Sequence, residues 1–327
     1  MDIQDIHLLK SFYDLEPQLE KFGEAVDKGL KSENKSLPSK FFYDGRGSLL
    51  FDKICKLQEY YLTRTEVALL NKIIPEFFSL TGNNLHLIEF GSGSSKKVKI
   101  LLSGLQSVRK YTAIDISRDH LSKSTIELAR KFPKIQVTAI CADYTKPMKL
   151  PASLKILNEN CIIFFPGSSI GNFSPFEAVS FLKSAIRLLE KTSGGLLIGV
   201  DLKKDEKILK AAYNDPSNVT AAFNLNLLYR ANKELGANFK LSQFSHEACY
   251  NQNKGRIEMY LISQMEQNVL IGNKAYSFTV GEKIHTENSY KYDIAEFCDL
   301  AKLAGLDLVK VWTDPKALYS LHFYKFY

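Results

Sequence analysis

The sequence predicts an α/β protein with a mostly parallel sheet covered by helices on both faces, and a second α+β domain. Three observations support this prediction. Short apolar segments alternate with amphipathic ones between residues 85 and 201, which is typical of βαβ units. A glycine turn follows the first apolar segment directly. The alternation then stops after Asp201 and returns only near the end of the chain.

The regular part contains short apolar strands spaced by helical segments. Strands are expected at 85–90, 111–115, 136–141, 161–165 and 196–201, and helices at 66–77, 118–131 and 175–190. Another helix is expected at 294–304, before strands at 308–312 and 317–324. Because the last two strands are joined by a short connection, we expect an antiparallel hairpin at the end of the sheet.

The remaining segments predict a second domain. Residues 1–60 are polar and helical in pattern, with a loop near 34–38, and residues 203–235 are mostly helical in pattern. Residues 243–285 contain hairpin-like alternation, as in Arg256–Leu261. We therefore expect a ligand-binding domain of residues 62–202 plus 290–327, and a second domain of residues 1–61 plus 203–289.

Composition and charge are those of an ordinary globular protein. The chain has 327 residues, 45% of them hydrophobic and 24% charged, and a net charge of +7. Because the lysines are dispersed, we expect no nucleic-acid partner. No apolar run approaches the length of a membrane span, so we expect no membrane partner. Nothing in the sequence demands more than a monomer, which is the expected state. The five cysteines lie far apart, which favours reduced thiols and a cytoplasmic protein. No spacing of histidine or cysteine is typical of a metal site, so we expect no metal.

The glycine turn, Gly91-Ser-Gly93, is the strongest functional signal. Its glycines allow positive φ and a close approach of the backbone to a ligand, and Ser94 or Ser95 is expected to cap the next helix. Lys96 stands where the dinucleotide fingerprint requires a third glycine, which disfavours NAD. A ligand with an adenosine but no pyrophosphate fits better, and S-adenosylmethionine is the candidate. An ordinary tight turn is the alternative.

Two aspartates follow the next strands. Asp115 lies 24 positions after Gly91, near the spacing at which an acidic residue binds ribose hydroxyls, although it could instead belong to a helix cap. Asp143, with Tyr144, follows the third strand, where a carboxylate can accept a hydrogen bond from an adenine amino group. A simple turn before Pro147 is the alternative for Asp143.

A second glycine-containing segment, residues 166–173, follows the fourth strand. It is expected at the same carboxyl edge as Gly91, with room for a substrate beside the cofactor. The amide of Asn172 could bind a carboxylate. It could equally belong to the start of the next helix, where Ser174-Pro175 is typical of a cap followed by a first-turn proline.

Several longer strings carry a resemblance to a known family. They are Phe-Tyr-Asp-x-Arg-Gly-Ser-x-Leu-Phe-Asp (42–52), Glu-Tyr-Tyr-x-Thr-Arg-Thr-Glu (59–66), Glu-x-Gly-Ser-Gly-Ser-Ser (89–95), Gly-Ser-x-Ile-Gly-Asn-Phe (167–173), Asn-x-Thr-Ala-Ala-Phe-Asn-x-Asn (218–226), Arg-Ile-Glu-Met (256–259) and Trp-Thr-Asp-Pro (312–315). With these strings, the chain resembles the histidine Nα-methyltransferases of ergothioneine biosynthesis, which use S-adenosylmethionine. The resemblance implies a Rossmann-like methyltransferase domain with a seven-stranded, mostly parallel sheet, and a second domain that binds the substrate.

The resemblance also implies roles for matched residues. Cofactor contacts are expected from Gly91, Lys97, Asp115, Asp143 and Tyr144. Contacts to the imidazole ring of the substrate are expected from Tyr60, Glu287 and Ser289, with Met259 packed beside the ring. The substrate carboxylate is assigned to Asn172 and Tyr213, and its amine to Tyr43 and the Gly167 backbone. Tyr43 and Tyr60 are the candidate catalytic residues.

The implied activity is trimethylation of the α-amino group of L-histidine to hercynine. The chain departs from the family pattern at Leu62, Pro166 and Asn288, and Asn288 lies between two of the proposed imidazole contacts. Other possibilities are a methyltransferase for another amino acid or a histidine derivative, an RNA or protein methyltransferase suggested by the basic charge, and a non-catalytic cofactor-binding protein.

Overall fold

The chain folds into two units. A computed structural model describes residues 7–17, 20–93, 95–151, 154, 159–189 and 192–326. Within the described residues, unit 1 comprises 7–17, 64–202 and 292–326, and unit 2 comprises 20–63 and 203–291.

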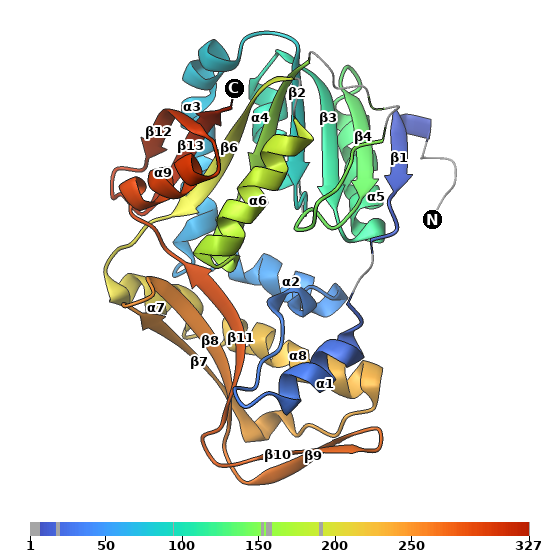
Figure 1. Cartoon of the computed structure of the whole chain (residues 1–327), viewed down its shortest axis with the longest axis vertical. Helices are drawn as coiled ribbons and strands as arrows, with labels where there is room; N and C mark the ends of the chain where they lie inside the picture. Colours follow the sequence, from blue (N-terminus) through green and yellow to red (C-terminus); the bar gives the residue numbers. More distant parts are fainter. Residues whose placement is uncertain are drawn as a thin grey trace. The chain divides into compact units, whose positions relative to one another are not determined.

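An eight-stranded sheet runs through unit 1 in the order β1-β4-β3-β2-β5-β6-β13-β12 (Figure 1). Its strands are β1 (Ser11–Asp14), β2 (Leu85–Phe90), β3 (Val108–Asp115), β4 (Gln136–Cys141), β5 (Asn160–Phe165), β6 (Ser193–Asp201), β12 (Asp307–Thr313) and β13 (Tyr319–Lys325). The strands from β1 to β6 pair in parallel, and β13 and β12 continue the sheet in antiparallel pairs. The predicted α/β class and the closing hairpin are therefore confirmed.

The N-terminal segment differs from the prediction. A helical pattern was expected over residues 1–60, but Ser11–Asp14 form a strand that pairs in parallel with β4, and the sheet has eight strands instead of seven. Residues 7–17 accordingly group with unit 1, whereas the sequence placed residues 1–61 in the second domain. This short strand exists because of its bonds to a distant strand, which local periodicity does not reveal.

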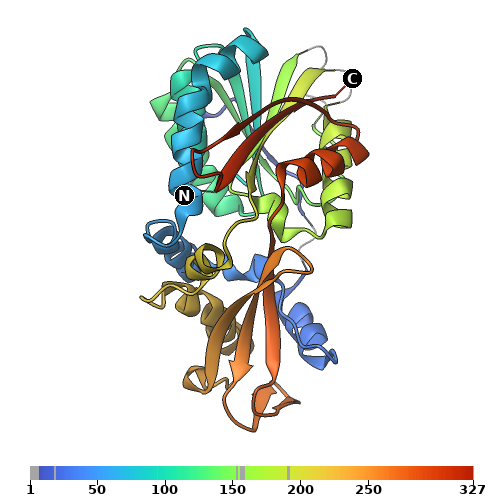
Figure 2. The same ribbon diagram turned by 90° about the vertical axis from the view of Figure 1, so that its left-hand side faces the viewer.

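Helices cover both faces of the sheet of unit 1. Helices α3 (Tyr61–Thr81), α4 (Lys96–Gly104) and α5 (Arg118–Lys131) contribute buried residues such as Leu70, Leu101 and Leu128 to one apolar core with the strands. Helices α6 (Pro175–Leu188) and α9 (Ile294–Leu303) cover the opposite face (Figures 1 and 2). The predicted end of α6 at Glu190 lies outside the described residues.

The strand order places a topological switch point at β2 and β5. From β2 the chain continues to β3 on one side, whereas from β5 it continues to β6 on the other. Ligands of open α/β sheets bind beside the carboxyl ends of strands at such a point. Gly91 follows β2 and Gly167 follows β5, so both glycine turns lie there.

Unit 2 combines helices with antiparallel strands, as predicted for an α+β domain. Its three-stranded sheet has the order β11-β8-β7, and a separate hairpin pairs β10 with β9 (Figure 1). These strands are β7 (Phe244–Asn251), β8 (Arg256–Ser263), β9 (Gln267–Ile271), β10 (Lys274–Phe278) and β11 (Lys283–Tyr290). The helices are α1 (Phe22–Lys31), α2 (Gly45–Ile54), α7 (Glu206–Tyr213) and α8 (Val219–Leu235), with short turns at Ser39–Phe42 and Leu241–Gln243.

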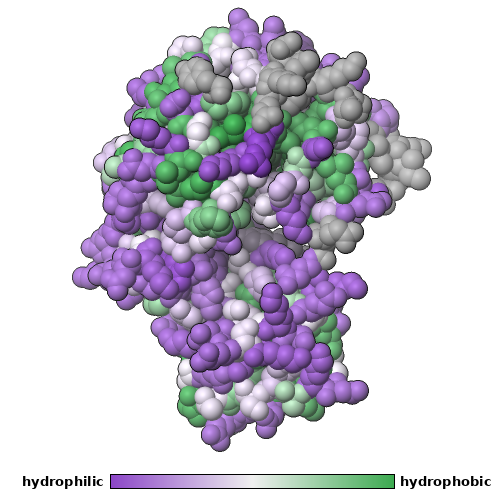
Figure 3. Space-filling view, viewed as in Figure 1, coloured by the Kyte–Doolittle hydropathy of each residue, from purple (hydrophilic) through white to green (hydrophobic). Residues whose placement is uncertain are grey.

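The surface carries scattered apolar residues. On the face drawn in Figure 3, hydrophilic residues cover most of unit 2, and hydrophobic residues are interspersed with them on unit 1. Within the described part of the chain, we find no helix with the length and apolarity needed to cross a membrane.

Candidate active site

The turn after β2 has the backbone conformation that its glycines predict. Gly91 has a φ of +68° and Gly93 a φ of +40°. A Cβ atom added to Gly91 would lie 3.1 Å from the hydroxyl oxygen of Tyr144, closer than nearly all natural contacts of this kind. Gly91 is therefore needed both for its backbone conformation and for the approach of Tyr144.

Ser95 does not cap α4 with its side chain, as one of the two predicted alternatives required. Ser95 is the N-cap residue of α4, but it adopts a left-handed conformation with a φ of 55°, and its side chain makes no cap hydrogen bond. A capping serine normally has extended backbone, from which its oxygen reaches the first helical N–H groups. Ser94, the alternative cap, lies outside the described residues.

Two buried hydroxyl groups in the same turn lack partners. Ser92 Oγ and Ser95 Oγ are buried without a hydrogen bond to any described residue. Buried polar groups are normally satisfied, so unpaired hydroxyls beside two positive-φ glycines are what a site for a polar ligand presents. This observation fits the amino-acid or ribose part of S-adenosylmethionine.

We expect Gly91→Ala to weaken S-adenosylmethionine binding by about tenfold or more, because an alanine at positive φ costs roughly 1–2 kcal/mol and its Cβ displaces Tyr144. Isothermal titration calorimetry measures the Kd. Gly82→Ala is the control, since Gly82 has a φ of +69° with no atom within 4 Å of the added Cβ. Equal S-adenosylmethionine affinity of the wild type and Gly91→Ala would contradict the prediction.

Asp115 and Asp143 both hold turns at the carboxyl edge of the sheet. Asp115 accepts hydrogen bonds from the N–H of Gly93 at 3.3 Å and of Ser117 at 2.9 Å. It thus links the glycine turn to the start of α5, which is compatible with both of its predicted roles. Asp143 Oδ1 accepts a hydrogen bond from the Thr145 hydroxyl group at 2.5 Å, which agrees with the interpretation of Asp143 as a turn residue. Its contact to an adenine amino group stays a prediction.

Aromatic rings line this edge of unit 1. Tyr144 stacks on Phe90, with ring centroids 5.7 Å apart and an interplanar angle of 8°. Burial raises the pKa of the Tyr144 hydroxyl, and the charge of Asp115 acts in the same direction. Tyr144 therefore stays protonated as a hydrogen-bond donor beside Gly91.

Lys97 is part of a buried ion pair that was not predicted. Its Nζ lies 2.5 Å from Oε2 of Glu66, and the side chain of Glu66 is fully buried. The same carboxylate accepts the backbone N–H of Gly167 at 2.8 and 3.0 Å. Glu66 thus connects α3 to Lys97, after the first glycine turn, and to Gly167 in the second glycine turn. Gly167 has a φ of +83°.

Asn172 lies at the end of a short 3-10 helix, η4 (Ser169–Asn172), at the same edge. Its side chain is exposed, and it makes no hydrogen bond to any described residue. The cap of α6 is formed by Ser174 with Glu177, and Pro175 occupies the first turn as predicted. Asn172 is therefore not used for the cap and is available to a ligand.

In unit 2, three of the predicted substrate contacts share one face of the sheet. Glu287 of β11 pairs with Met259 of β8 in the antiparallel register, so their side chains lie on the same face. Ser289 follows Glu287 by two residues and is on this face too. We call it the acidic face, defined by Glu287, Met259 and Ser289.

Tyr213, at the end of α7, contacts the acidic face. Its hydroxyl oxygen lies 2.9 Å from Oγ of Ser289 and 3.0 Å from Nζ of Lys291. Tyr213 and Ser289 were assigned to different parts of the substrate, the carboxylate and the ring. Their direct contact places the two predicted binding groups side by side.

Tyr60 and Tyr43 belong to an aromatic cluster of unit 2. The ring of Tyr60 is edge-on to those of Tyr213 and Phe51, each with a centroid distance of 6.3 Å. The ring of Tyr43 packs against Phe51 and Phe223 at 5.5 and 5.6 Å. Tyr60 is buried, whereas Tyr43 is 46% exposed. Three of the tyrosines predicted from the resemblance are thus joined by contacts between rings.

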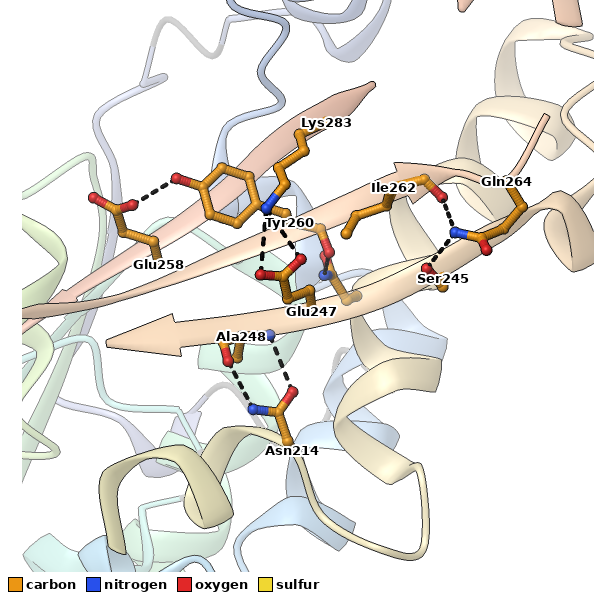
Figure 4. Close-up of polar contacts among 10 residues, drawn as sticks. Asn214, Ser245, Glu247, Ala248, Glu258, Tyr260, Ile262, Gln264 and Lys283 are labelled. Atoms are coloured by element: carbon orange, nitrogen blue, oxygen red, sulfur yellow. Dashed lines mark hydrogen bonds and ion pairs between the residues drawn. The ribbon is translucent and has the colours of Figure 1, made fainter. Parts of the chain in front are cut away.

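The opposite face of the same sheet has a separate set of contacts, which Figure 4 shows in part. There Tyr260 donates a hydrogen bond to Glu258, and Lys283 pairs with Glu247 at 3.0 Å. Asn288 pairs with Glu258 in the register and bonds His285 Nε2 at 2.9 Å. The departure from the family pattern at Asn288 therefore lies on the face away from Glu287 and Ser289.

Comparisons with known proteins match this arrangement to a family. The model of the histidine-specific, S-adenosylmethionine-dependent methyltransferases matches residues 22–326. The chain belongs to this family. The predicted resemblance is thereby confirmed, and so is the predicted use of S-adenosylmethionine.

Individual relatives of this methyltransferase cover most of its length. A histidine N-alpha-methyltransferase of Mycolicibacterium smegmatis is 36% identical over 90% of this chain and 92% of its own. Ergothioneine biosynthesis protein 1 of Neurospora crassa is 32% identical over 89% of this chain but only 33% of its own. The N-methyltransferase imqF of Aspergillus flavus is 29% identical over 89% of this chain and 81% of its own.

Burial changes the acidity of two carboxyl groups in the methyltransferase. Burial raises the pKa of Glu287 to about 7, although the charge of Lys291 acts in the opposite direction. In unit 1, burial raises the pKa of Glu89, near the end of β2, to about 8. Tyr111 donates a hydrogen bond to Glu89 at 2.5 Å. Glu89 is therefore mostly neutral at pH 7 and adds little negative charge beside the glycine turn.

One group of potential metal ligands lies away from these residues. Among the described residues, ligand atoms of His86, Glu159 and Cys161 lie within 4.8 Å of one another, near the amino ends of β2 and β5. His86 bonds Glu159 and Thr112, both at 2.8 Å, and Lys110 neutralises Glu159. These bonds account for the cluster as a buried polar network. The absence of a bound metal stays a prediction.

Sequence reasoning missed Glu66, Glu89 and Lys291 as members of the site. Glu66 and Glu89 stand within the strings that carry the resemblance, at 59–66 and 89–95, and that position was an available signal. Lys291 stands outside those strings, two residues after Ser289. Only the continuation of the alternation from Glu287 through Ser289 could have indicated it.

Proposed function

We propose that this methyltransferase trimethylates the α-amino group of L-histidine to hercynine, the first step of ergothioneine biosynthesis. The observation that carries the proposal is the half-buried Glu287, which shares one face of the unit 2 sheet with Met259 and Ser289. The names of the relatives at 36% identity support the same substrate. The proposal assigns cofactor contacts to unit 1, with Gly91, Lys97, Asp115, Asp143 and Tyr144.

Recognition of the ring rests on Glu287. An ionised carboxylate accepts a charge-assisted hydrogen bond from an imidazole N–H, which is about twice as strong as a bond between neutral groups. Ser289 and Tyr60 supply further hydrogen-bonding groups, and Met259 packs beside the ring. A site with such buried polar groups rejects apolar side chains, because these would leave Glu287 unpaired.

The proposed roles at the other end of the substrate are polar. The proposal assigns Asn172 and Tyr213 to the carboxylate, and Tyr43 and the backbone of Gly167 to the amine. Bound S-adenosylmethionine would supply an electrophilic methyl group on a sulfonium. The residues contribute by orienting the neutral amine for in-line attack, and positioning of this kind is worth about 7–11 kcal/mol. The amine loses its proton to water near Tyr43.

The aromatic cluster suits the product. Each transfer puts one positive charge on the nitrogen. The mono- and dimethyl intermediates lose a proton to water before the next transfer, whereas the final group is a quaternary ammonium that keeps its charge and is weakly hydrated. The cluster of Tyr43, Tyr60 and Tyr213 offers aromatic rings whose faces attract such a cation. Cation–π contacts contribute on the order of 1–2 kcal/mol when the cation is desolvated. This favours continued methylation of a bound intermediate.

The decisive experiment is an incubation of the protein with isotopically labelled S-adenosylmethionine and L-histidine, followed by mass spectrometry. We expect mono-, di- and trimethylhistidine, with the trimethylated product accumulating. A parallel panel of other amino acids and of histidine derivatives tests the alternative substrates. A higher kcat/KM for another amine overturns the histidine assignment, and no methyl transfer to any of them favours a non-catalytic binding protein.

A further inference from the structure

A buried lysine completes the acidic face of unit 2. Lys291 follows β11 and stands two residues beyond Ser289 and four beyond Glu287. Its side chain is only 1% exposed. Nζ lies 2.8 Å from Ser289 Oγ and 3.0 Å from the Tyr213 hydroxyl oxygen, and 4.9 Å from the centroid of the Tyr213 ring. A buried ammonium is rare and requires such partners.

The three groups form a triangle of hydrogen bonds with a fixed direction. An ammonium only donates, so Lys291 donates to the oxygen of Tyr213 and to that of Ser289. These two oxygens are themselves 2.9 Å apart, and one hydroxyl donates to the other. The three polar groups thus hold one another in a fixed arrangement.

We propose that Lys291 is a positioning residue: it fixes the hydroxyl groups of Tyr213 and Ser289 in the orientation in which they bind the amino acid substrate. This inference rests on the proposed function, since it assumes that histidine binds at the acidic face. The part of the substrate that they bind is the α-carboxylate or the imidazole ring. Each of these carries a lone pair that can accept a hydrogen bond from a hydroxyl group.

The charge of Lys291 serves the same arrangement. Glu287 provides the acceptor for a ring N–H, and the ammonium four residues away favours the ionised form of Glu287. The acidic face thus carries a hydrogen-bond acceptor at Glu287 and, beside it, the hydroxyl groups of Tyr213 and Ser289. A neutral imidazole or a zwitterionic amino acid presents the complementary pair of groups.

The test compares Lys291→Met with the wild type in steady-state methylation of histidine. We expect KM for histidine to rise about 10- to 100-fold, with kcat lowered less than about threefold and an unchanged Kd for S-adenosylmethionine. Lys283→Met is the matched control, because Lys283 is on the same strand but pairs with Glu247 on the opposite face (Figure 4). It is expected to leave all three quantities unchanged.

A double-mutant cycle distinguishes positioning from a general structural effect. Lys291→Met is expected to raise KM much less in a Tyr213→Phe/Ser289→Ala background, where no hydroxyl remains to be positioned. If Lys291→Met does not fold, Lys291→Gln replaces it in the same cycle. An unchanged KM in the Lys291 variants, or a fully additive cycle, overturns this inference and leaves the proposed function intact. A wild type that does not methylate histidine overturns the proposed function as well.

Discussion

Replacing Glu287 with glutamine is expected to lower kcat/KM for histidine by about 100-fold, mainly through KM. The neutral amide is a weaker acceptor for the ring N–H than the carboxylate, and its own NH₂ group needs a partner at a half-buried position. Initial rates over a range of histidine concentrations measure the effect, with calorimetry to show that S-adenosylmethionine binding is retained.

The matched control for Glu287 is Glu247→Gln. Glu247 also lies in the unit 2 sheet, but its carboxylate pairs with Lys283 on the opposite face and is partly exposed (Figure 4). Its replacement is expected to change kcat/KM by less than about twofold, since exposed ion pairs contribute about 0–1 kcal/mol. Equal kinetic effects of the two glutamine variants would show that Glu287 does not bind the ring.

The same residue predicts a pH dependence. Burial raises the pKa of Glu287 to about 7, so its ionised form is present above that pH and is lost as the pH falls through it. KM for histidine in the wild type should therefore rise as the pH is lowered from about 8 to about 6. The imidazole of free histidine has a pKa of about 6.5, and its titration affects the wild type and Glu287→Gln equally. The difference between the profiles of the wild type and Glu287→Gln thus reports Glu287, and parallel profiles would contradict its assignment.

The sequence predicted the sheet of unit 1 well because its strands are apolar and its helices amphipathic. The strand of Gln136–Cys141 and the helix of Arg118–Lys131 were predicted with the bounds observed. Local periodicity predicts such elements, because an element that buries one or both of its faces has apolar residues at regular positions in the sequence. Strand β1 was not predicted, because a four-residue strand at a sheet edge is stabilised by its partner β4 and has too few residues for a periodic signal.

The site was predicted where residues lie close in sequence to a motif. The glycine conformations at Gly91 and Gly93 follow from the turn itself, and the shared face of Glu287 and Ser289 follows from strand alternation. The hydrogen bonds of Glu66 could not be predicted in this way. Its partner Gly167 is 101 residues away, and nothing near Glu66 in the sequence specifies that contact. Contacts of this kind arise only from the packing of the whole unit.

Glu66→Ala is therefore expected to have the largest effect on unit 1. The fully buried carboxylate pairs with Lys97 and accepts the N–H of Gly167. Its loss leaves a partly buried ammonium and a backbone N–H without partners, which costs about 3 kcal/mol in the free energy of unfolding. Because both partners lie at the turns that are assigned to ligands, we also expect S-adenosylmethionine to bind at least about tenfold more weakly.

Chemical denaturation measures the stability change, and calorimetry measures the cofactor affinity. Glu127→Ala is the control, because Glu127 pairs with Lys99 at the same distance of 2.5 Å while its side chain is 68% exposed. An exposed ion pair contributes about 0–1 kcal/mol to the free energy of unfolding. Glu127→Ala should therefore have nearly the stability and cofactor affinity of the wild type. Glu66→Gln keeps an acceptor for the N–H of Gly167 but loses the charge. Its free energy of unfolding and its affinity for S-adenosylmethionine should therefore lie between those of Glu66→Ala and Glu127→Ala. Equal stability of Glu66→Ala and Glu127→Ala would mean that burial does not make this ion pair important, and the link from α3 to the two glycine turns would lose its support.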